Sequence, residues 1–232
     1  MPIDRFRVRP SAGTLFAFFV VVLALAEAHE CAHILTARIV CGGWGVRDFS
    51  VWSTAEGCSD HPFVLLATFA GPLFTYAVMW ASIWMLRREG PDSQRSIGIV
   101  LIFGALPFAR VFTAITGHGD EVSGFTELTG NHWTGWMIGL ASVFLLSVYP
   151  LACAYRNLAP ERRPLVFCAL LIMPILLHGL VIHGAMNSLL RNKVWSANGC
   201  LGSPWLVNVW QVVLLVSSLA FWRRANELFG SA

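Results

Sequence analysis

Long apolar stretches alternate with short polar segments along the chain. A helix needs about 20 apolar residues to cross the hydrocarbon core of a bilayer, and six stretches meet that requirement. These predicted spans cover residues 14–40, 62–86, 96–117, 133–155, 165–188 and 205–222. The gaps between them hold at most about 20 residues, too few for a separate soluble module. The pattern therefore predicts an all-α, polytopic membrane helical bundle with about six transmembrane helices, in which residues 1–232 form a single membrane-embedded domain.

Composition supports this prediction and the basic residues add an orientation. Only 12% of the residues are charged, about half the level of soluble proteins. Most basic residues fall in alternate gaps, namely Arg5, Arg7, Arg9, Arg87, Arg88, Arg95, Arg156, Arg162, Arg163, Arg223 and Arg224. Because positively charged segments stay in the cytoplasm, both termini are predicted to be cytoplasmic, in a plasma or inner membrane. A nucleic-acid partner is not expected, since the basic residues form no clustered face.

The start of the first span also has the composition of a signal peptide. Residues 5–9 are basic, residues 15–23 are apolar, and Ala24-Leu25-Ala26 offers small residues for cleavage. However, the apolar helical pattern continues to Val40, which favours a retained membrane span.

The first span carries the string His29-Glu30-Cys31-Ala32-His33. Residues four apart lie on one face of a helix, so the two imidazoles can bind one metal ion. Glu30 lies beside them and can accept a proton from a metal-bound water. His-Glu-x-x-His on a helix is therefore typical of zinc hydrolases. Ionisable residues inside a membrane span are costly and generally functional, which favours a metal site over a hydrogen-bonded cluster.

A catalytic zinc ion requires a third protein ligand. The third predicted span ends in Thr116-Gly117-His118-Gly119-Asp120 and reaches the same side of the membrane as His29 and His33. Geometry alone leaves both His118 and Asp120 open as that ligand. Glu121 and Glu127, which follow, are interpreted as solvated loop acids. Glu27 could pair with Arg110 of the third span or line a wet cavity.

The first half of the chain resembles the site-2 protease family of intramembrane zinc metalloproteases. The resemblance rests on His29-Glu30-Cys31-Ala32-His33 and on Phe69-Ala70-Gly71-Pro72-Leu73-Phe74 in the next span. It implies a three-helix metalloprotease-like core over residues 14–125, with residues 133–232 as an additional three-helix region. It also implies that Asp120 is the third zinc ligand. Where the family commonly has Asn, this chain has Thr75.

We therefore predict an intramembrane zinc-dependent endopeptidase that cleaves a membrane-anchored protein substrate. Zn²⁺ is the expected cofactor, held by His29, His33 and Asp120, with Glu30 as the catalytic base. The expected partners are a membrane protein or peptide substrate and the lipid bilayer. One alternative is a non-catalytic membrane assembly or binding subunit that keeps a degenerate site.

A haem-binding redox membrane subunit is the other alternative, because the fifth predicted span contains His178 and His183. Five residues on an α-helix correspond to about 140°, so the two rings should not share one ion. Gly179 and Gly184 instead favour close helix packing, with each His hydrogen-bonded across the bundle.

The gap between the first two spans contains Cys41 and Cys58. In an oxidising compartment they could form a disulfide that closes this loop; free thiols are equally compatible with the sequence.

Overall fold

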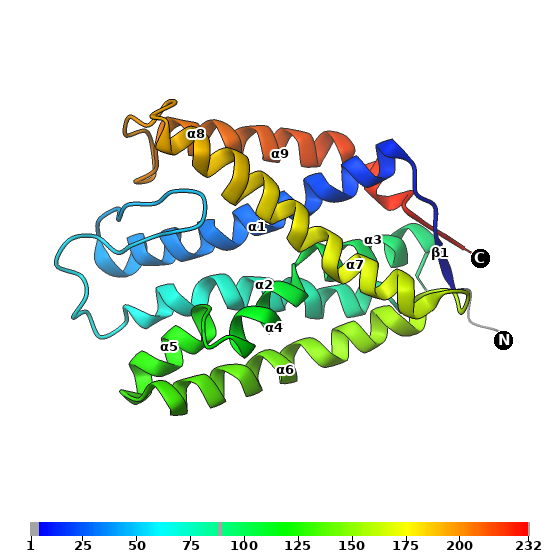
Figure 1. Ribbon diagram of the computed structural model, residues 1–232, viewed down its shortest axis with the longest axis horizontal. Coiled ribbons are helices and arrows are strands. Elements are labelled where there is room, and N and C mark those ends of the chain that lie inside the picture. Colours follow the sequence, from blue (N-terminus) through cyan, green and yellow to red (C-terminus); the bar gives the residue numbers. More distant parts are fainter. Residues whose placement is uncertain (1–4, 88–89, 232) are drawn as a thin grey trace.

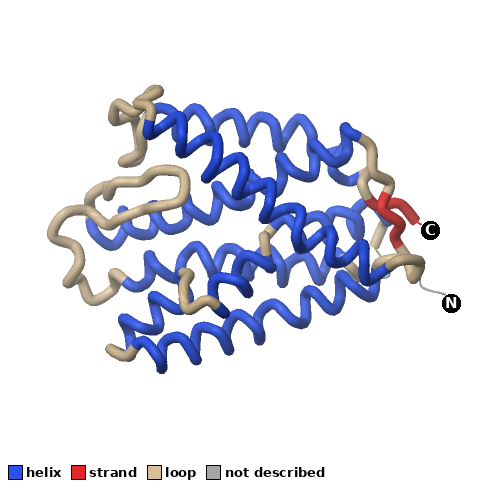
Figure 2. Tube along the Cα trace, viewed as in Figure 1, coloured by secondary structure: helices blue, strands red, loops and turns tan. Residues whose placement is uncertain are grey.

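The computed structural model describes residues 5–87 and 90–231 and is an all-α bundle. Among these residues, six helical segments are long and apolar enough to cross a membrane, as the hydrophobic pattern predicted. Arg88, one of the basic residues used for orientation, lies outside the described residues. Figures 1 and 2 show the helices running roughly side by side, with loop 42–64 at one end and both termini at the other.

The first span is helix α1 (Ala12–Cys41). It begins at Ser11, whose hydroxyl accepts a hydrogen bond from the Thr14 backbone N–H (3.1 Å), while the Thr14 hydroxyl accepts one from the Ser11 N–H (2.9 Å). It ends where Gly42 takes a left-handed conformation (φ 70°) and its N–H bonds to the Arg38 carbonyl. This uninterrupted helix keeps His29 and His33 one turn apart.

The third span consists of two helices, α3 (Asp92–Gly104) and α4 (Pro107–Ile115), which follow α2 (Leu65–Met85). Leu106 between them has a positive φ of 54°. Pro107 then starts α4, because its missing N–H is not needed in a first helical turn. This break redirects the chain and brings Arg110 toward α1.

A short helix that the sequence did not predict, α5 (Asp120–Thr129), folds back after the third span. It packs closely on α6 (His132–Asn157), where Gly135 and Gly139 leave room for its backbone. A Cβ added to Gly139 would lie 2.9 Å from the Val122 Cα. Small residues one turn apart allow membrane helices to approach closely, and here they hold the helix that begins with Asp120.

The remaining elements are α7 (Arg163–His178), the π-helix η1 (Gly179–Met186), α8 (Asn187–Arg191), α9 (Trp205–Asn226) and the strands β1 (Phe6–Val8) and β2 (Phe229–Ser231). The two strands pair in antiparallel fashion and join the two ends of the described chain. In Figure 1, α7 crosses diagonally in front of the bundle. Only 11% of the apolar stretch in the α7–α8 span is buried inside the protein, against 56% for the third span. The α7–α8 span therefore packs less against the other helices.

The apolar core lies among α1, α2 and α3, with the largest buried side chains from Phe18, Met79, Ile99 and Phe103. Burying these side chains contributes about 1.5–3 kcal/mol each in water, while inside a bilayer close packing supplies most of the gain. This core fixes α1 against α2, and so places the two histidines against the Gly71-Pro72 segment.

Candidate metal centre

The two histidines of α1 point their Nε2 atoms toward each other. His33 is fully buried and His29 nearly so. The Nδ1 of His33 is 2.7 Å from the Ala67 carbonyl, which can only accept, so this nitrogen carries the proton. The Nδ1 of His29 is 2.9 Å from the Thr75 hydroxyl. These second partners fix both rings, as expected for metal-binding histidines.

Asp120 lies beside the two Nε2 atoms. Its Oδ2 is 3.3 Å from His29 Nε2 and 3.6 Å from His33 Nε2, and the two Nε2 atoms are 3.1 Å apart. Ligand atoms around a tetrahedral zinc ion are about 3.3 Å apart, given bonds of roughly 2.0–2.1 Å. The structure therefore brings together His29, His33 and Asp120 in a cluster that could hold a metal ion. His118 is exposed and is not among these three residues.

The atoms that face one another in this cluster are mainly hydrogen-bond acceptors, which favours a positive charge between them. Arg110 Nη2 is 2.7 Å from His29 Nε2, and because Arg can only donate, that nitrogen holds a lone pair. In a neutral ring His33 Nε2 also holds one, since Nδ1 carries the proton. Two lone pairs and a carboxylate oxygen this close repel one another unless positive charge lies between them. Here the Arg110 guanidinium supplies that charge, and the donor set fits a zinc ion.

Space at the cluster depends on Gly71 of α2. A Cβ added at this position would lie 2.6 Å from His29 Cε1 and 2.7 Å from His29 Nε2. Only glycine lets the α2 backbone approach the two rings this closely. Gly71, part of the motif singled out in the sequence, thus has a steric role at the histidines.

Glu30 faces a small cavity next to the cluster. This cavity has a volume of about 110 Å³, and His29, Thr75 and Arg110 also line it. The Glu30 Oε2 is buried and has no hydrogen-bond partner among the described residues. A buried, unpartnered carboxylate oxygen is costly and is expected where a water or substrate binds. A larger apolar cavity of about 850 Å³ lies against Glu27, Cys31 and Ala32, which are on the other face of α1.

Arg110 connects the cluster to acids that the sequence placed elsewhere. Its Nη1 is 2.7 Å from Asp120 and 3.3 Å from Glu121. The interpretation of Glu121 as a solvated loop acid is therefore wrong: the residue is buried and accepts a 2.7 Å hydrogen bond from the Tyr76 hydroxyl. Glu127, by contrast, is exposed. The suggested Glu27–Arg110 pair is also wrong, because Arg110 is engaged here.

Glu27 instead pairs with Arg47, from the loop between α1 and α2. Arg47 is fully buried, and Gln211 of α9 donates to the same Glu27 oxygen at 3.0 Å. Burial alone lowers the pKa of the Arg47 guanidinium, but the Glu27 carboxylate outweighs it and raises that pKa above its usual value. Arg47 thus stays charged and anchors the loop in the bundle.

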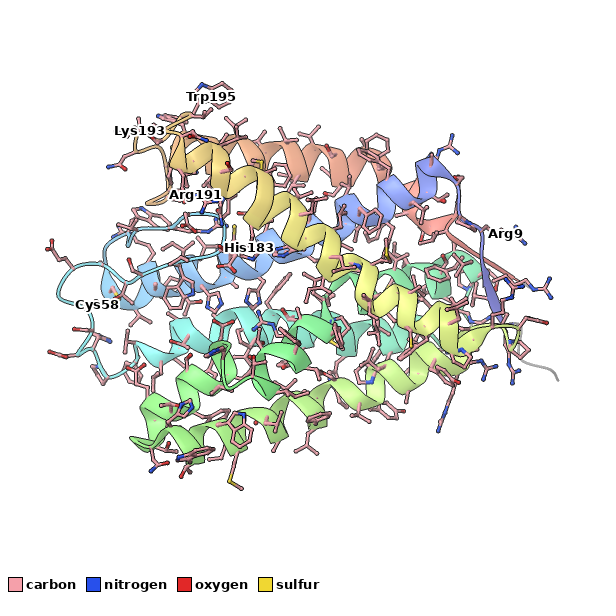
Figure 3. The ribbon with its side chains drawn as sticks, in the orientation of Figure 1. Arg9, Cys58, His183, Arg191, Lys193 and Trp195 are labelled. Atoms are coloured by element: carbon pink, nitrogen blue, oxygen red, sulfur yellow. A yellow bond between two sulfur atoms is a disulfide. The ribbon has the colours of Figure 1, made fainter. Side chains whose placement is uncertain are left out.

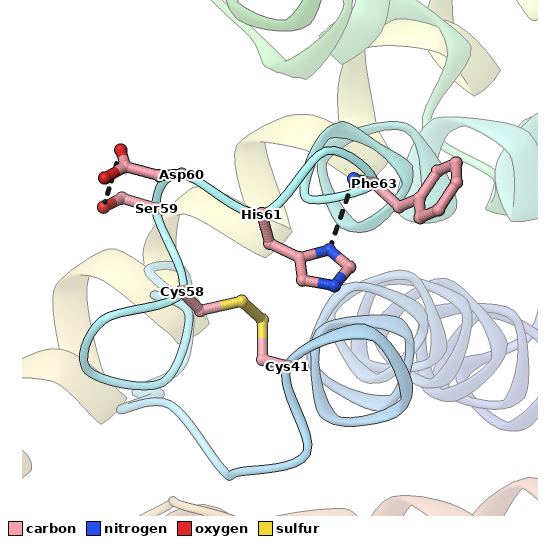
Figure 4. The surroundings of a disulfide bond; sticks show 6 residues. All are labelled: Cys41, Cys58, Ser59, Asp60, His61 and Phe63. Carbon is pink, nitrogen blue, oxygen red and sulfur yellow. Dashed lines mark hydrogen bonds between the residues drawn. A yellow bond between two sulfur atoms is a disulfide. The ribbon is translucent and has the colours of Figure 1, made fainter.

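The same loop covers the histidines. A tight turn at Asp48 places Arg47 opposite Trp52, and the Trp52 ring stacks on His33 with centroids 4.7 Å apart. Cys41 and Cys58 form a disulfide that closes the loop (Figure 4). Of the two alternatives that the sequence left open for these cysteines, the structure contains the bridge.

His178 and His183 are arranged differently from the sequence prediction. The chain between them is a π-helix, in which hydrogen bonds join residues five apart, so the two rings lie one turn apart with centroids at 5.9 Å. The predicted angle of 140° assumed an α-helix. The expected tight packing is also wrong: a Cβ at Gly179 would meet nothing within 4 Å, and one at Gly184 nothing closer than 3.8 Å.

No family model, no curated protein and no solved structure matches this chain. The case for its function consequently rests on the residues and geometry described above.

Proposed function

We propose that this protein is an intramembrane zinc-dependent endopeptidase with a site-2-protease-like core. The main support for the proposal is that the side chains of His29, His33 and Asp120 lie close enough together to hold one metal ion. They come from helices α1 and α5, which are far apart in the sequence: α1 ends at Cys41 and α5 begins at Asp120. Three protein ligands of this kind with an open position are typical of catalytic zinc sites. Glu30, adjacent to the pair, supplies the general base that such a hydrolase requires.

Each residue near the cluster has a distinct role in the proposed peptide hydrolysis. A zinc ion bound by the cluster would polarise the peptide carbonyl and acidify a water molecule. Glu30 accepts a proton from the attacking water and delivers it to the departing amine nitrogen. Thr75 and the Ala67 carbonyl bond to the Nδ1 atoms of the two imidazoles, so both Nε2 atoms face Asp120. Arg110 keeps Asp120 ionised and oriented.

The environment supports a membrane-anchored substrate. The cluster lies within a bundle of apolar spans, and its adjoining cavity of about 110 Å³ cannot hold an intact helix. A substrate segment must therefore unwind before its peptide bond reaches Glu30. The distribution of arginines supports cytoplasmic termini. The loop that covers the site is at the other end of the bundle (Figure 1) and would then lie on the opposite side of a plasma or inner membrane.

Zinc analysis combined with Glu30→Gln tests the proposal. The substitution keeps the side-chain shape and removes the base, so the purified variant should retain one zinc per chain. It should also lose cleavage of a single-span fluorescent peptide with a central Gly-Pro, presented in phosphatidylcholine–phosphatidylglycerol liposomes. Absence of stoichiometric zinc in the wild type, or undiminished cleavage by Glu30→Gln, would show instead a non-catalytic subunit with a degenerate site.

A further inference from the structure

One histidine outside the ligand cluster faces the cavity beside Glu30. His29, Glu30, Thr75 and Arg110 line this cavity from α1, α2 and α4, and His178 lines it from α7. His178 thus brings a polar side chain to the candidate site from the second half of the chain, which the family resemblance does not cover.

The position of His178 depends on the π-helix that begins at Gly179. Hydrogen bonds five residues apart widen the helix by one residue per turn and place His183 next to His178. The two rings meet edge to face, with an interplanar angle of 79°. His178 is half-buried and His183 is exposed, and Figure 3 shows His183 nearer to Cys58 than to Arg9 along the bundle.

Neither ring forms a hydrogen bond to another described residue, and the two rings contact each other. An imidazole without a polar partner is costly inside a membrane span. Short π-helical segments interrupt α-helices frequently at functional sites. A polar ring that faces the cavity of a candidate base, on such a segment, therefore points to a ligand in that cavity.

We propose that His178 is a further catalytic residue, which donates a hydrogen bond to the oxygen of the scissile carbonyl. The inference rests on the proposed endopeptidase function. As the water oxygen bonds to the carbonyl carbon, the carbonyl π electrons move to the oxygen and the water proton moves to Glu30. When the C–N bond breaks, Glu30 returns that proton to the amine nitrogen. His178 keeps its own proton throughout, and His183 is a positioning residue that holds the ring.

This role follows from the arrangement of charges in the cavity. Glu30 is an acceptor and Arg110 is engaged with Asp120, Glu121 and His29. The imidazole of His178, which lines the same cavity, carries an N–H donor whether it is neutral or protonated. A fixed donor at the oxygen that becomes negative stabilises the transition state more than the ground state.

The test compares His178→Leu, which removes the donor, with His178→Gln, which restores a neutral one. His132→Gln, at an exposed position that begins α6, is the matched control. With the liposome peptide described above, His178→Leu should lower kcat about 10²–10³-fold while KM and zinc content stay within about twofold. His178→Gln should recover at least about tenfold of that loss, and the control should behave as the wild type.

A second measurement does not depend on turnover. A phosphinic analogue of the same peptide resembles the tetrahedral transition state, so its affinity should fall in parallel with kcat in His178→Leu. The affinity of the uncut peptide, measured in the Glu30→Gln background, should not change. If His178→Leu does not accumulate, His178→Phe and the analogue affinity decide the question.

The outcomes separate the two proposals. Unchanged kcat and analogue affinity in His178→Leu, with Glu30→Gln inactive, overturn the role of His178 and leave the endopeptidase in place. A rise in KM without a fall in kcat also overturns it, since it would show ordinary substrate binding. Active Glu30→Gln or a zinc-free wild type overturns the endopeptidase itself.

Discussion

The molecule contains two histidine pairs, each one helical turn apart, and they end in different surroundings. His29 and His33 are four residues apart on an α-helix, whereas His178 and His183 are five apart on a π-helix. In the first pair each Nδ1 has a partner and both Nε2 atoms meet Asp120. In the second pair the rings contact each other, and no carboxylate joins them within the described residues.

The comparison shows that spacing along a helix does not by itself create a cluster that could hold a metal ion. Both spacings place two rings together, because each matches the turn of its own type of helix. What distinguishes the first pair is the set of partners that other helices bring: Thr75 and Ala67 from α2, and Asp120 from α5. We therefore expect metal at the first pair alone.

Removing one side chain at each pair, Asp120 at the first and His183 at the second, should give the largest contrast. Asp120→Ala takes away the only carboxylate of the cluster, so the purified protein should lose stoichiometric zinc completely. His183→Leu should retain one zinc per chain. Elemental analysis by mass spectrometry measures both; equal zinc in the two variants would contradict the assignment of the cluster.

Alanine substitutions of a glycine near each pair should also differ strongly in their effect on zinc affinity. Gly71→Ala pushes a methyl group into the His29 ring, at 2.6 Å from Cε1, and should lower zinc affinity by at least about 100-fold, a magnitude typical of lost support around a metal site. Gly184→Ala meets nothing closer than 3.8 Å and should leave affinity unchanged. Competition with a fluorescent chelator gives both affinities, and a tolerated Gly71→Ala would argue against close approach of α2.

The loop over the first pair should depend on its buried arginine. Arg47→Leu leaves Glu27 buried with its charge uncompensated except by Gln211, which should cost about 3–5 kcal/mol in the free energy of unfolding. Arg191→Leu, at an exposed position near the second pair, should change stability by less than about 0.5 kcal/mol. Denaturant titration in detergent micelles compares them, and similar stabilities would mean that Arg47 does not anchor the loop.

The smallest expected effect is that of the hydroxyl behind His29. Thr75→Val removes the hydrogen-bond partner of its Nδ1 and should weaken zinc binding about 10–100-fold. Thr75→Ser keeps the hydroxyl and should bind zinc as the wild type does. If chelator competition finds the two variants alike, the hydrogen bond does not support the ligand.

Local patterns were enough to predict much of this structure. Hydropathy predicted the six spans, since each depends on its own run of apolar residues. The spacing of His29 and His33 predicted their common face, because α1 is an uninterrupted helix. The bond between Thr75 and His29 was not predicted, since the sequence marked Thr75 only as a departure from a family motif.

Features that depend on distant parts of the chain were not predictable in this way. Arg110 bonds to His29, which is 81 residues away in the sequence. Glu121 is buried against Tyr76 and Arg110, which both donate hydrogen bonds to its carboxylate. Helix α5 packs on both α6 and α2, and the sequence of residues 120–129 does not reveal these neighbours. The π-helix was also not predicted. One additional residue in a helical turn changes the hydrogen-bond register of the helix but leaves the segment equally apolar.

The strand pair at the ends of the described chain has a consequence for biosynthesis. Phe6 pairs with Ser231 and Val8 with Phe229, and α1 packs on α9. One flank of α1 therefore stays uncovered until α9 has been synthesised, and contacts of such long sequence separation form slowly. Until α9 arrives, Glu27 and Cys31 on this flank lack the hydrogen bonds that Gln211 supplies in the folded protein.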